Sequence, residues 1–444
     1  MGSRQCVLLS LGSIVVVGLV VAAAMLYFTT QRRRIGLFVQ VSDVHLDKDY
    51  HENGQLDNYC HLPTPPSARG HFRRRSAGKS QGDDIGLFGN YECDSPLSLV
   101  RSAFQAAAAV EPRPDAVFWT GDTYPHLPNE LYNTELTVRT LADVTRELKE
   151  AFPHTERVIP TLGNHDYHPS DQFPDRPNAV YDAAADLWAD WIRSAEQDAV
   201  VRRGGYYERE VIPGAVVSLN LNNNLFNRPN EAELDNPEDP AGHFQWMEER
   251  LRSARDNSLK VIISSHIGVG VSERRFDGDS WLKERYNERL VSLFTEYSDV
   301  IWFHVYGHSH SDTFYLMRRG EGHPGVSNPS FRVIEYDTQT LRITNIRQYY
   351  LDLTKANRLR RAEWELEYDY ASAYGLSEVT ADSLHQLHSQ RLSNDLALFH
   401  QYFLRNSAQQ PGWTTCDERC RVGHLCAMAN VDLAAYRRCL REGV

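Results

Sequence analysis

The chain has 444 residues, of which 41% are hydrophobic and 24% charged, with a formal net charge of −12 at pH 7. This length suffices for a large catalytic core and a smaller appendage, and the eight Trp, 22 Tyr and 17 Phe exclude global disorder. The acidic balance argues against a nucleic-acid-coating protein, which needs basic surface, so no nucleic-acid partner is expected.

The first 34 residues carry a long apolar segment. Residues 6–30 contain no charged side chain and are flanked by Arg4 and by Arg32, Arg33 and Arg34. Such a segment can span a bilayer, and it also fits a signal peptide with a cleavage signal at Ala22–Ala24. We interpret residues 1–34 as a signal peptide or a signal-anchor, which leaves a membrane association through residues 6–30 open.

Six cysteines follow this segment: Cys60, Cys93, Cys416, Cys420, Cys426 and Cys439. Their even number indicates disulfides formed in an oxidising compartment, although the last four could instead bind zinc. The arginines after residue 30 favour a cytoplasmic body, but a cleaved signal peptide removes that conflict. We therefore expect a secreted, extracellular or lumenal (lysosomal) protein, with a single N-terminal transmembrane anchor as the alternative.

Apolar runs typical of strands alternate with helical patterns along residues 35–350, which predicts a layered α/β catalytic domain. The expected strands are Gly36–Val41, Ala116–Thr120, Arg157–Leu162, Val216–Leu221, Lys260–Ser264 and Val300–Val305. The expected helices are Leu97–Val110, Glu130–Phe152, Val180–Gln197, Phe244–Asp256 and Trp281–Tyr297, with Ser95 capping the first of them. Residues 351–444 form a helical C-terminal domain with the cysteine cluster, including amphipathic stretches at Leu353–Tyr374 and Ala381–Leu404.

Polar residues follow directly on these apolar runs. They are Asp43 and His45, Asp122, Asn164 and His165, Asn222, His266, and His308 and His310. In open α/β sheets, ligand sites form beyond the carboxyl ends of the strands. We therefore expect these side chains to converge at one edge of the molecule.

This inventory suits a two-metal centre that hydrolyses a phosphodiester through a metal-activated water. Two ions about 3.5–4 Å apart lower the pKa of bound water to ~7 and clamp phosphate oxygens. Asp122 is the expected bridge between the ions, and Asn164 and His266 suit the second ion.

Two further histidines are candidates for catalysis. His165 would lie beside the bound phosphate, and His126 follows Asp122 on the same loop. Either could protonate the leaving group, since imidazole titrates near neutral pH; the alternative for His126 is a hydrogen bond to substrate or Asp122. Other histidines, including His243, are expected on the surface.

The motifs together resemble the acid sphingomyelinase-like phosphodiesterases of the calcineurin-like metallophosphoesterase superfamily. The resemblance rests on Ser42–Asp47, Cys93–Pro96, Trp119–Asp122 with His126, Leu162–Tyr167, Tyr306–His310, Gln348–Thr354 and the closing cysteines. It implies a β-sandwich flanked by helices and two zinc ions per chain. One ion would be held by Asp43, His45, Asp122 and His310, the other by Asp122, Asn164, His266 and His308. Manganese or iron would also suit these ligands.

The resemblance further implies the disulfides Cys60–Cys93, Cys416–Cys420 and Cys426–Cys439. It predicts a monomeric phosphoric diester hydrolase that cleaves phosphodiester or pyrophosphate bonds of nucleotides or similar soluble substrates. The alternatives are a sphingomyelin or glycerophosphodiester hydrolase and a catalytically weak surface scaffold. The founding sphingomyelinases carry a saposin domain before the catalytic body, which extracts lipid from membranes. Here about 35 residues precede the first motif, so we expect soluble substrates. The stretch after His310 is shorter than in relatives, so we expect a more open pocket.

Overall fold

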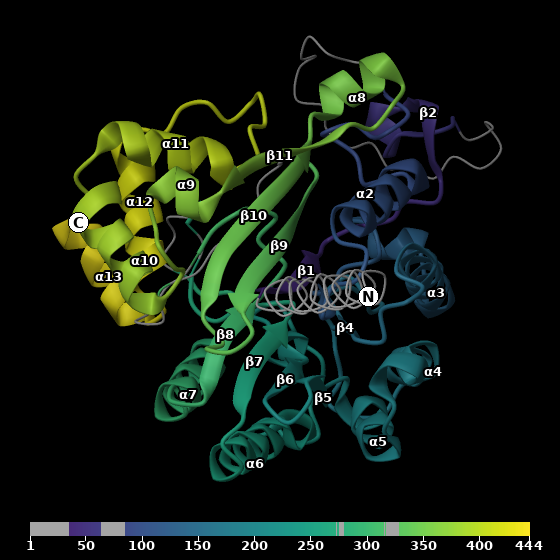
Figure 1. Cartoon of the computed structure of the whole chain (residues 1–444). Helices are drawn as coiled ribbons and strands as arrows, with labels where there is room; N and C mark the ends of the chain where they lie inside the picture. Colours follow the sequence, from purple (N-terminus) through teal and green to yellow (C-terminus); the bar gives the residue numbers. More distant parts are fainter. Residues whose placement is uncertain (1–34, 64–84, 272, 275–278, 315, 317–327) are drawn as a thin grey trace, which may run out of the picture.

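The computed structural model describes residues 35–63, 85–271, 273–274, 279–314, 316 and 328–444. Two mixed sheets form its centre: a six-stranded sheet in the order β11-β10-β9-β1-β3-β4, and a four-stranded sheet in the order β5-β6-β7-β8 (Figure 1). The strands are β1 (Ile35–Val41), β2 (Tyr50–Gln55), β3 (Ala116–Trp119), β4 (Val158–Pro160), β5 (Tyr207–Ile212), β6 (Val216–Leu221), β7 (Lys260–Ser265), β8 (Ile301–Val305), β9 (Ser330–Asp337), β10 (Ile343–Leu351) and β11 (Trp364–Asp369).

Helices cover the sheets on their outer faces and form most of the C-terminal region (Figure 1). They are α2 (Leu97–Val110), α3 (Thr134–Ala151), α4 (Ala179–Ile192), α5 (Ala195–Gly204), α6 (His243–Asp256), α7 (Glu284–Glu296), α8 (Leu353–Leu359), α9 (Tyr370–Tyr374), α10 (Ala381–Gln386), α11 (Leu396–Asn406), α12 (Glu418–Ala429) and α13 (Leu433–Glu442).

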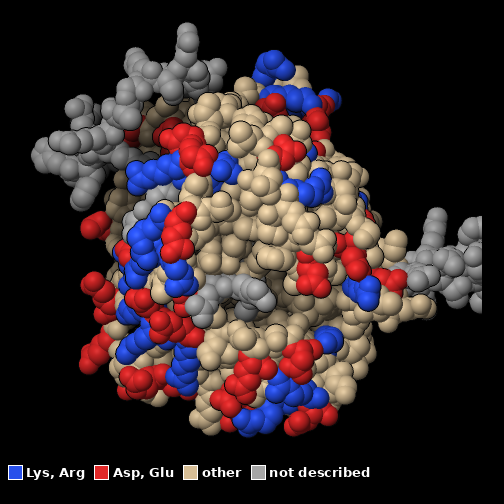
Figure 2. Space-filling view, turned by 90° about the vertical axis from the view of Figure 1, so that its left-hand side faces the viewer, with Lys and Arg blue, Asp and Glu red and all other residues tan. Residues whose placement is uncertain are grey.

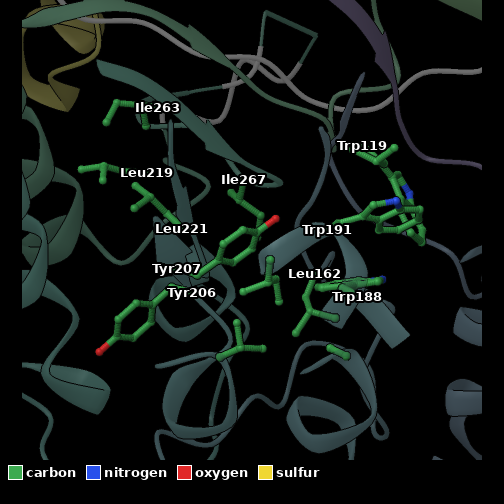
Figure 3. Close-up of a cluster of buried hydrophobic side chains, with 14 of the residues drawn as sticks. Trp119, Leu162, Trp188, Trp191, Tyr206, Tyr207, Leu219, Leu221, Ile263 and Ile267 are labelled. Carbon is green, nitrogen blue, oxygen red and sulfur yellow. The ribbon is translucent and has the colours of Figure 1, made fainter. Parts of the chain in front are cut away.

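Alternation along β1 and β3 places apolar side chains on both faces of the large sheet. Phe38 and Phe118 face the small sheet, where Phe38 meets the Trp302 ring at 6.0 Å between centroids. Their neighbours Val39 and Trp119 belong to the other core, which includes the helices, and Trp119 packs edge-on against Trp188 at 5.8 Å (Figure 3). Both faces of each sheet are therefore covered by apolar side chains.

The strands that carry the motifs run parallel in two groups. β1, β3 and β4 are mutually parallel neighbours in one sheet, and β6, β7 and β8 in the other. Leu162 and Ile267, just beyond β4 and β7, are fully buried and belong to the cluster drawn in Figure 3. Leu162 directly precedes the polar residues 163–166, and Ile267 directly follows His266, so these buried side chains anchor the loops next to the polar residues.

All six expected strands are present within two residues of their predicted ends. The prediction of a helical Leu353–Tyr374 is wrong in its middle, where β11 pairs antiparallel with β10 and only the flanks form α8 and α9. Adjacent Glu365 and Leu366 are both exposed on this edge strand, so the segment lacks the inside–outside alternation typical of a strand. Pairing with β10, which no local pattern reveals, decides the conformation.

Three local predictions also need correction. The helix expected at Val180–Gln197 breaks at Arg193, which has a φ of 53°, and Ser194 caps α5 instead. Pro96, not Ser95, occupies the N-cap of α2, because the Ser95 backbone bonds to the loop after β1. His243 is fully buried, stacked on Tyr206 at 4.2 Å between centroids, and burial lowers its pKa to about 3.

The three disulfides implied by the resemblance are present: Cys60–Cys93, Cys416–Cys420 and Cys426–Cys439. Disulfides are typical of extracellular or lumenal proteins. Within the described residues, no helix has the length and apolar character needed to cross a membrane. The segments interpreted as a signal or anchor (1–34) and most of the shortened stretch after His310 lie outside the described residues.

Glu367 on β11 predicts a pH dependence of stability. Burial, reinforced by the Asp312 carboxylate, raises its pKa to about 8 from an ordinary 4.5. Because the folded chain keeps a proton that the unfolded chain loses, this stabilisation is complete below pH ~4.5 and is lost as the pH rises through ~8. We expect the unfolding free energy of the wild type to fall relative to Glu367→Gln by on the order of 4 kcal/mol between these pH values. Urea unfolding of both proteins at both pH values measures this difference. An equal change in the unfolding free energy of wild type and Glu367→Gln would contradict the prediction.

Candidate metal centre

The loops after five strands meet at one edge of the sandwich. Backbone hydrogen bonds join them in pairs: Asp43 N–H donates to Gly121 O at 3.0 Å, and Gly307 N–H donates to His266 O at 2.9 Å. The two sheets are linked by His308 N–H, which donates to Asp43 Oδ1 at 2.8 Å. Residues separated by more than 260 positions thus share one site, as the strand-end spacing predicts.

One cluster consists of Asp43, His45, Asp122 and His310, whose candidate ligand atoms lie within 4.8 Å of one another. His45 Nε2 is 3.1 Å from His310 Nε2 and 3.4 Å from Asp122 Oδ2, and His310 Nε2 is 3.3 Å from Asp43 Oδ1. Two carboxylates and two imidazoles directed at one point form a donor set suited to a divalent metal.

A second cluster shares Asp122 with the first and adds His266 and His308. His266 Nε2 lies 3.1 Å from Asp122 Oδ2 and 2.9 Å from Asn164 Oδ1. Asp122 Oδ2 therefore has an imidazole of each cluster beside it, which is the position a bridging carboxylate occupies. The structure brings together all seven residues predicted as metal ligands.

The histidine tautomers fit metal binding. His45 Nδ1 is 2.8 Å from Tyr124 O, and His266 Nδ1 is 2.7 Å from Thr120 O. A carbonyl oxygen only accepts, so each Nδ1 carries a proton and each Nε2 is the nitrogen that faces the cluster.

The electrostatics also suit a cation. Burial, reinforced by the neighbouring His126, holds the pKa of His45 well below its usual range, so this imidazole stays neutral. Burial alone would lower the pKa of His266, but Asp122 raises it to about 9, so without a metal this imidazole is protonated and a divalent ion would take the place of its Nε2 proton. The pair formed by His266 and Asp122 thus attracts positive charge, and the buried residues present fit divalent metal ions.

The backbone is strained where the ligands lie. Asp43, His45, Asp122, His308 and His310 have φ values of 52°, 38°, 56°, 66° and 47°. This left-handed region costs non-glycine residues on the order of 1 kcal/mol each and clusters at functional sites. The strain turns side chains of alternate residues, such as His308 and His310, toward one site.

Glycine is required where two of these loops touch. A Cβ on Gly163 would lie 2.1 Å from Asp122 Oδ1, and one on Gly307 would lie 2.2 Å from Ser42 Oγ. These close approaches explain the Gly-Asn-His-Asp and Gly-His-Ser-His patterns.

His126 and His165 lie beside the first cluster, outside the ligand set. Their rings are 4.4 Å apart between centroids, and the His126 ring stacks on His45 at 3.9 Å. His126 Nδ1 is 2.7 Å from Asp94 Oδ1, and His165 Nδ1 is 3.1 Å from Ser170 Oγ. Burial opposes protonation of His126, but the Asp94 carboxylate raises its pKa above the ordinary value, whereas burial lowers the pKa of His165 to about 4.

Sequence reasoning missed two carboxylates that position the site. Asp94 holds His126 through both its ring and its backbone N–H. Asp166 accepts hydrogen bonds from the backbone N–H groups of Asp122, Thr123 and Gly163. Both belong to recognised motifs, so their positions were visible, but their partners lie up to 44 residues away. Asn222, by contrast, bonds to Tyr181 and Gly204 and only supports the fold.

The C-terminal region reaches the site through Asn406, at the end of α11. Its carbonyl accepts from Asp312 N–H at 3.0 Å, and its side-chain amide donates to Asp312 O at 3.1 Å and Glu273 Oε1 at 3.0 Å. Arg274 donates to Asn406 Oδ1 at 2.7 Å. Asn406, which is 1% exposed, therefore joins the loop after His310 to the loop after His266.

We expect Asn406→Ala to weaken metal retention about 10-fold, the low end of the effect of losing a direct partner of a metal ligand, because Asn406 bonds to the loops after His310 and His266 and not to the ligands themselves. Competition with a chromophoric chelator measures the metal affinity of the variant. Asn345→Ala is the matched control, because Asn345 joins β10 to Asp369 and Ala371, outside the metal loops. Equal metal affinity in the two variants would show that Asn406 supports only the fold.

Comparison with known proteins agrees with this geometry. Residues 36–312 match the family model of the calcineurin-like phosphoesterases, and residues 320–444 match that of the acid sphingomyelin phosphodiesterase C-terminal region. The chain is 33% identical to the acid sphingomyelinase-like phosphodiesterase 3b of Homo sapiens, over 92% of this chain and 91% of that one. It is 32% identical to the cyclic GMP-AMP phosphodiesterase SMPDL3A of Homo sapiens, over 92% and 90% of the two chains.

Among solved structures, a dimetal phosphatase from Danio rerio covers 70% of this chain and 95% of its own, at 14% identity and a TM-score of 0.39. The family assignment rests on the sequence matches alone. The chain belongs to the calcineurin-like phosphoesterases, within the acid sphingomyelinase-like phosphodiesterases, and is a metal-dependent phosphoric diester hydrolase.

Proposed function

We propose that this chain is a binuclear zinc phosphodiesterase that acts on nucleotides or similar soluble substrates, cleaving phosphodiester or pyrophosphate bonds. The observation that carries the proposal is the pair of ligand clusters that share Asp122. Two zinc ions would supply Lewis acidity toward the phosphate and a nucleophile at neutral pH. Zinc is proposed over manganese or iron because imidazole donors dominate and the disulfides indicate an oxidising compartment.

We assign the following roles to the residues of the chain. Asp43, His45, Asp122 and His310 would hold one ion, and Asp122, Asn164, His266 and His308 would hold the other. His126, kept in place by Asp94, donates a proton to the leaving oxygen. His165, whose ring lies 4.4 Å from that of His126, donates a hydrogen bond to the phosphate.

The setting of the enzyme is proposed on the same grounds. Three disulfides support an extracellular or lumenal location. On the face seen in Figure 2, basic and acidic side chains of the described residues are intermixed, which supports the expectation that no nucleic acid is bound. We propose a monomer, with residues 6–30 as a cleaved signal or a membrane anchor.

A substrate panel tests the proposal. The purified full chain is assayed with bis-p-nitrophenyl phosphate, ATP, cyclic GMP-AMP and sphingomyelin, with and without chelator. We expect chelator-sensitive turnover of the soluble esters. Turnover of sphingomyelin alone would show a lipid hydrolase instead. No turnover of any substrate would support the alternative function of a catalytically weak surface scaffold.

A further inference from the structure

The side-chain amide of Asn164 has two orientations, which place different atoms at the second ligand cluster. Its Oδ1, which lies 2.9 Å from His266 Nε2, is an atom that binds metal ions. Its Nδ2 is a hydrogen-bond donor and offers an ion no lone pair. A half-turn of the amide exchanges the two atoms, so the second ion needs a neighbour of Asn164 that permits only one orientation.

Asp171, in the loop after β4, is such a neighbour. The side chain of Asn164 donates a hydrogen bond to the Asp171 carboxylate, and the backbone N–H of Asp171 donates to Asn164 O at 2.9 Å. An ionised carboxylate only accepts hydrogen bonds. Asn164 therefore directs its Nδ2 toward Asp171 and its Oδ1 toward the cluster.

A contact from the small sheet holds the Asp171 carboxylate in turn. Asn227, in the loop after β6, donates from Nδ2 to Asp171 Oδ1 at 2.8 Å and is only 2% exposed. The backbone of Asp171 has a φ of 69°, in the left-handed region that aspartate and asparagine tolerate better than most other residues. Asp171 thus joins loops of both sheets beside the second cluster.

The charge of Asp171 also acts on this cluster. Its strongest interactions with other charged groups are with Asp122 and His266, which both belong to the second cluster. A carboxylate close to Asp122 adds repulsion between negative charges, and a bound cation relieves it. The same side chain therefore orients one ligand and increases the attraction for the ion.

We propose that Asp171 is a positioning residue of the second metal site, which keeps Asn164 Oδ1 directed at the ion. The proposal rests on the two-metal function proposed above and deepens it, because Asp171 belongs to neither ligand cluster. Loss of a hydrogen-bond partner of a metal ligand typically lowers metal affinity by about 10-fold to 100-fold. The loss of Asp171 should weaken the ion of the second cluster and spare the ion of the first.

Asp171→Asn tests the orientation with little change in size and with a residue that tolerates the positive φ. Asparagine offers an NH2 group besides its oxygen, so both orientations of the Asn164 amide become possible. The double variant Asn164→Asp/Asp171→Asn exchanges the two roles: the new carboxylate has an oxygen on either side, and the new amide donates to it. Asp171→Gly, which suits the backbone and removes the carboxylate, serves if Asp171→Asn does not fold.

Asp175→Asn is the matched control. Asp175 is a buried carboxylate in the same stretch of chain, and it accepts from the backbone N–H groups of Asp235 and Asn236 at 2.7 and 2.8 Å. It therefore holds a turn without contacting the ligands. His308→Ala, which lacks a ligand of the second cluster alone, identifies which of the two ions belongs to that cluster.

Zinc is titrated into the full chain after stripping with chelator, and a chromophoric chelator reports the free zinc. We expect Asp171→Asn to weaken the ion of the second cluster about 10-fold or more, with the other ion changed less than about threefold. The double variant should bind both ions within about threefold of the wild type, as the control should.

Unchanged zinc binding in Asp171→Asn, an equal loss in Asp175→Asn, or no recovery in the double variant would overturn the proposal. Fewer than two zinc ions bound to the wild type would contradict the two-metal function itself, so the two failures are distinguishable.

Discussion

Replacing Asp122 by asparagine is expected to abolish phosphodiester hydrolysis, with kcat falling at least about 1000-fold, because the bridging charge contributes several kcal/mol to the metal centre. Asp122 Oδ2 lies between His45 Nε2 and His266 Nε2, so its charge serves both clusters. Asparagine keeps the size of the side chain but offers one neutral oxygen. His308→Ala, which removes a ligand of the second cluster alone, should give a similar loss.

Activity and bound metal are measured on the same samples. We expect at most one tightly bound ion per chain in Asp122→Asn. Asp186→Asn, at an exposed carboxylate that pairs with Arg202, controls for the chemical change and should keep full activity. Two bound ions and wild-type kcat in Asp122→Asn would show that Asp122 does not bridge the two ions.

Loss of His126 or His165 is the second large effect. We expect His126→Ala and His165→Ala to lower kcat by about 100-fold to 10,000-fold, the range typical of a lost proton donor or acceptor. Bound metal should remain near the wild-type level, because the two clusters that share Asp122 keep all their ligands, although a ring nitrogen of His126 also lies within reach of His45 and His310. A parallel loss of metal would show that they support the site and do not take part in the reaction.

Substrates with different leaving groups distinguish the roles of His126 and His165. A proton donor matters most for a poor leaving group, so His126→Ala should slow release of an alkyl alcohol much more than release of p-nitrophenolate. His165→Ala should slow both to a similar degree. Asp94→Asn should resemble a weaker His126→Ala, since Asp94 bonds to His126 Nδ1 and N–H. If His165→Ala instead shows the leaving-group dependence, the two roles are exchanged.

The convergence of the candidate metal ligands could be predicted from sequence because their signal is local. Each follows an apolar run, and parallel strands bring such positions to one edge. Asp43 and His45 are spaced so that both side chains reach the first cluster, and His308 and His310 so that one side chain reaches each cluster. Their backbone strain, with φ values between 38° and 66°, was not visible in the sequence.

The residues that support the ligands could not be predicted, because their partners are distant in the chain. Asp94 lies 32 residues from His126, and Asn406 contacts Glu273 across 133 residues. β11 was missed for the same reason: its pairing with β10, and not a local pattern, sets its conformation. Local chemistry identified the site, but the tertiary contacts that hold it required the structure.

The most direct test of the account is the dependence of turnover on metal stoichiometry. The full chain is stripped with chelator, and zinc is added back in steps while hydrolysis of bis-p-nitrophenyl phosphate and bound zinc are followed together. We expect activity to vanish in the stripped protein and to return to its maximum at about two zinc ions per chain, as the two clusters sharing Asp122 require. Full activity in the metal-free protein would contradict the account.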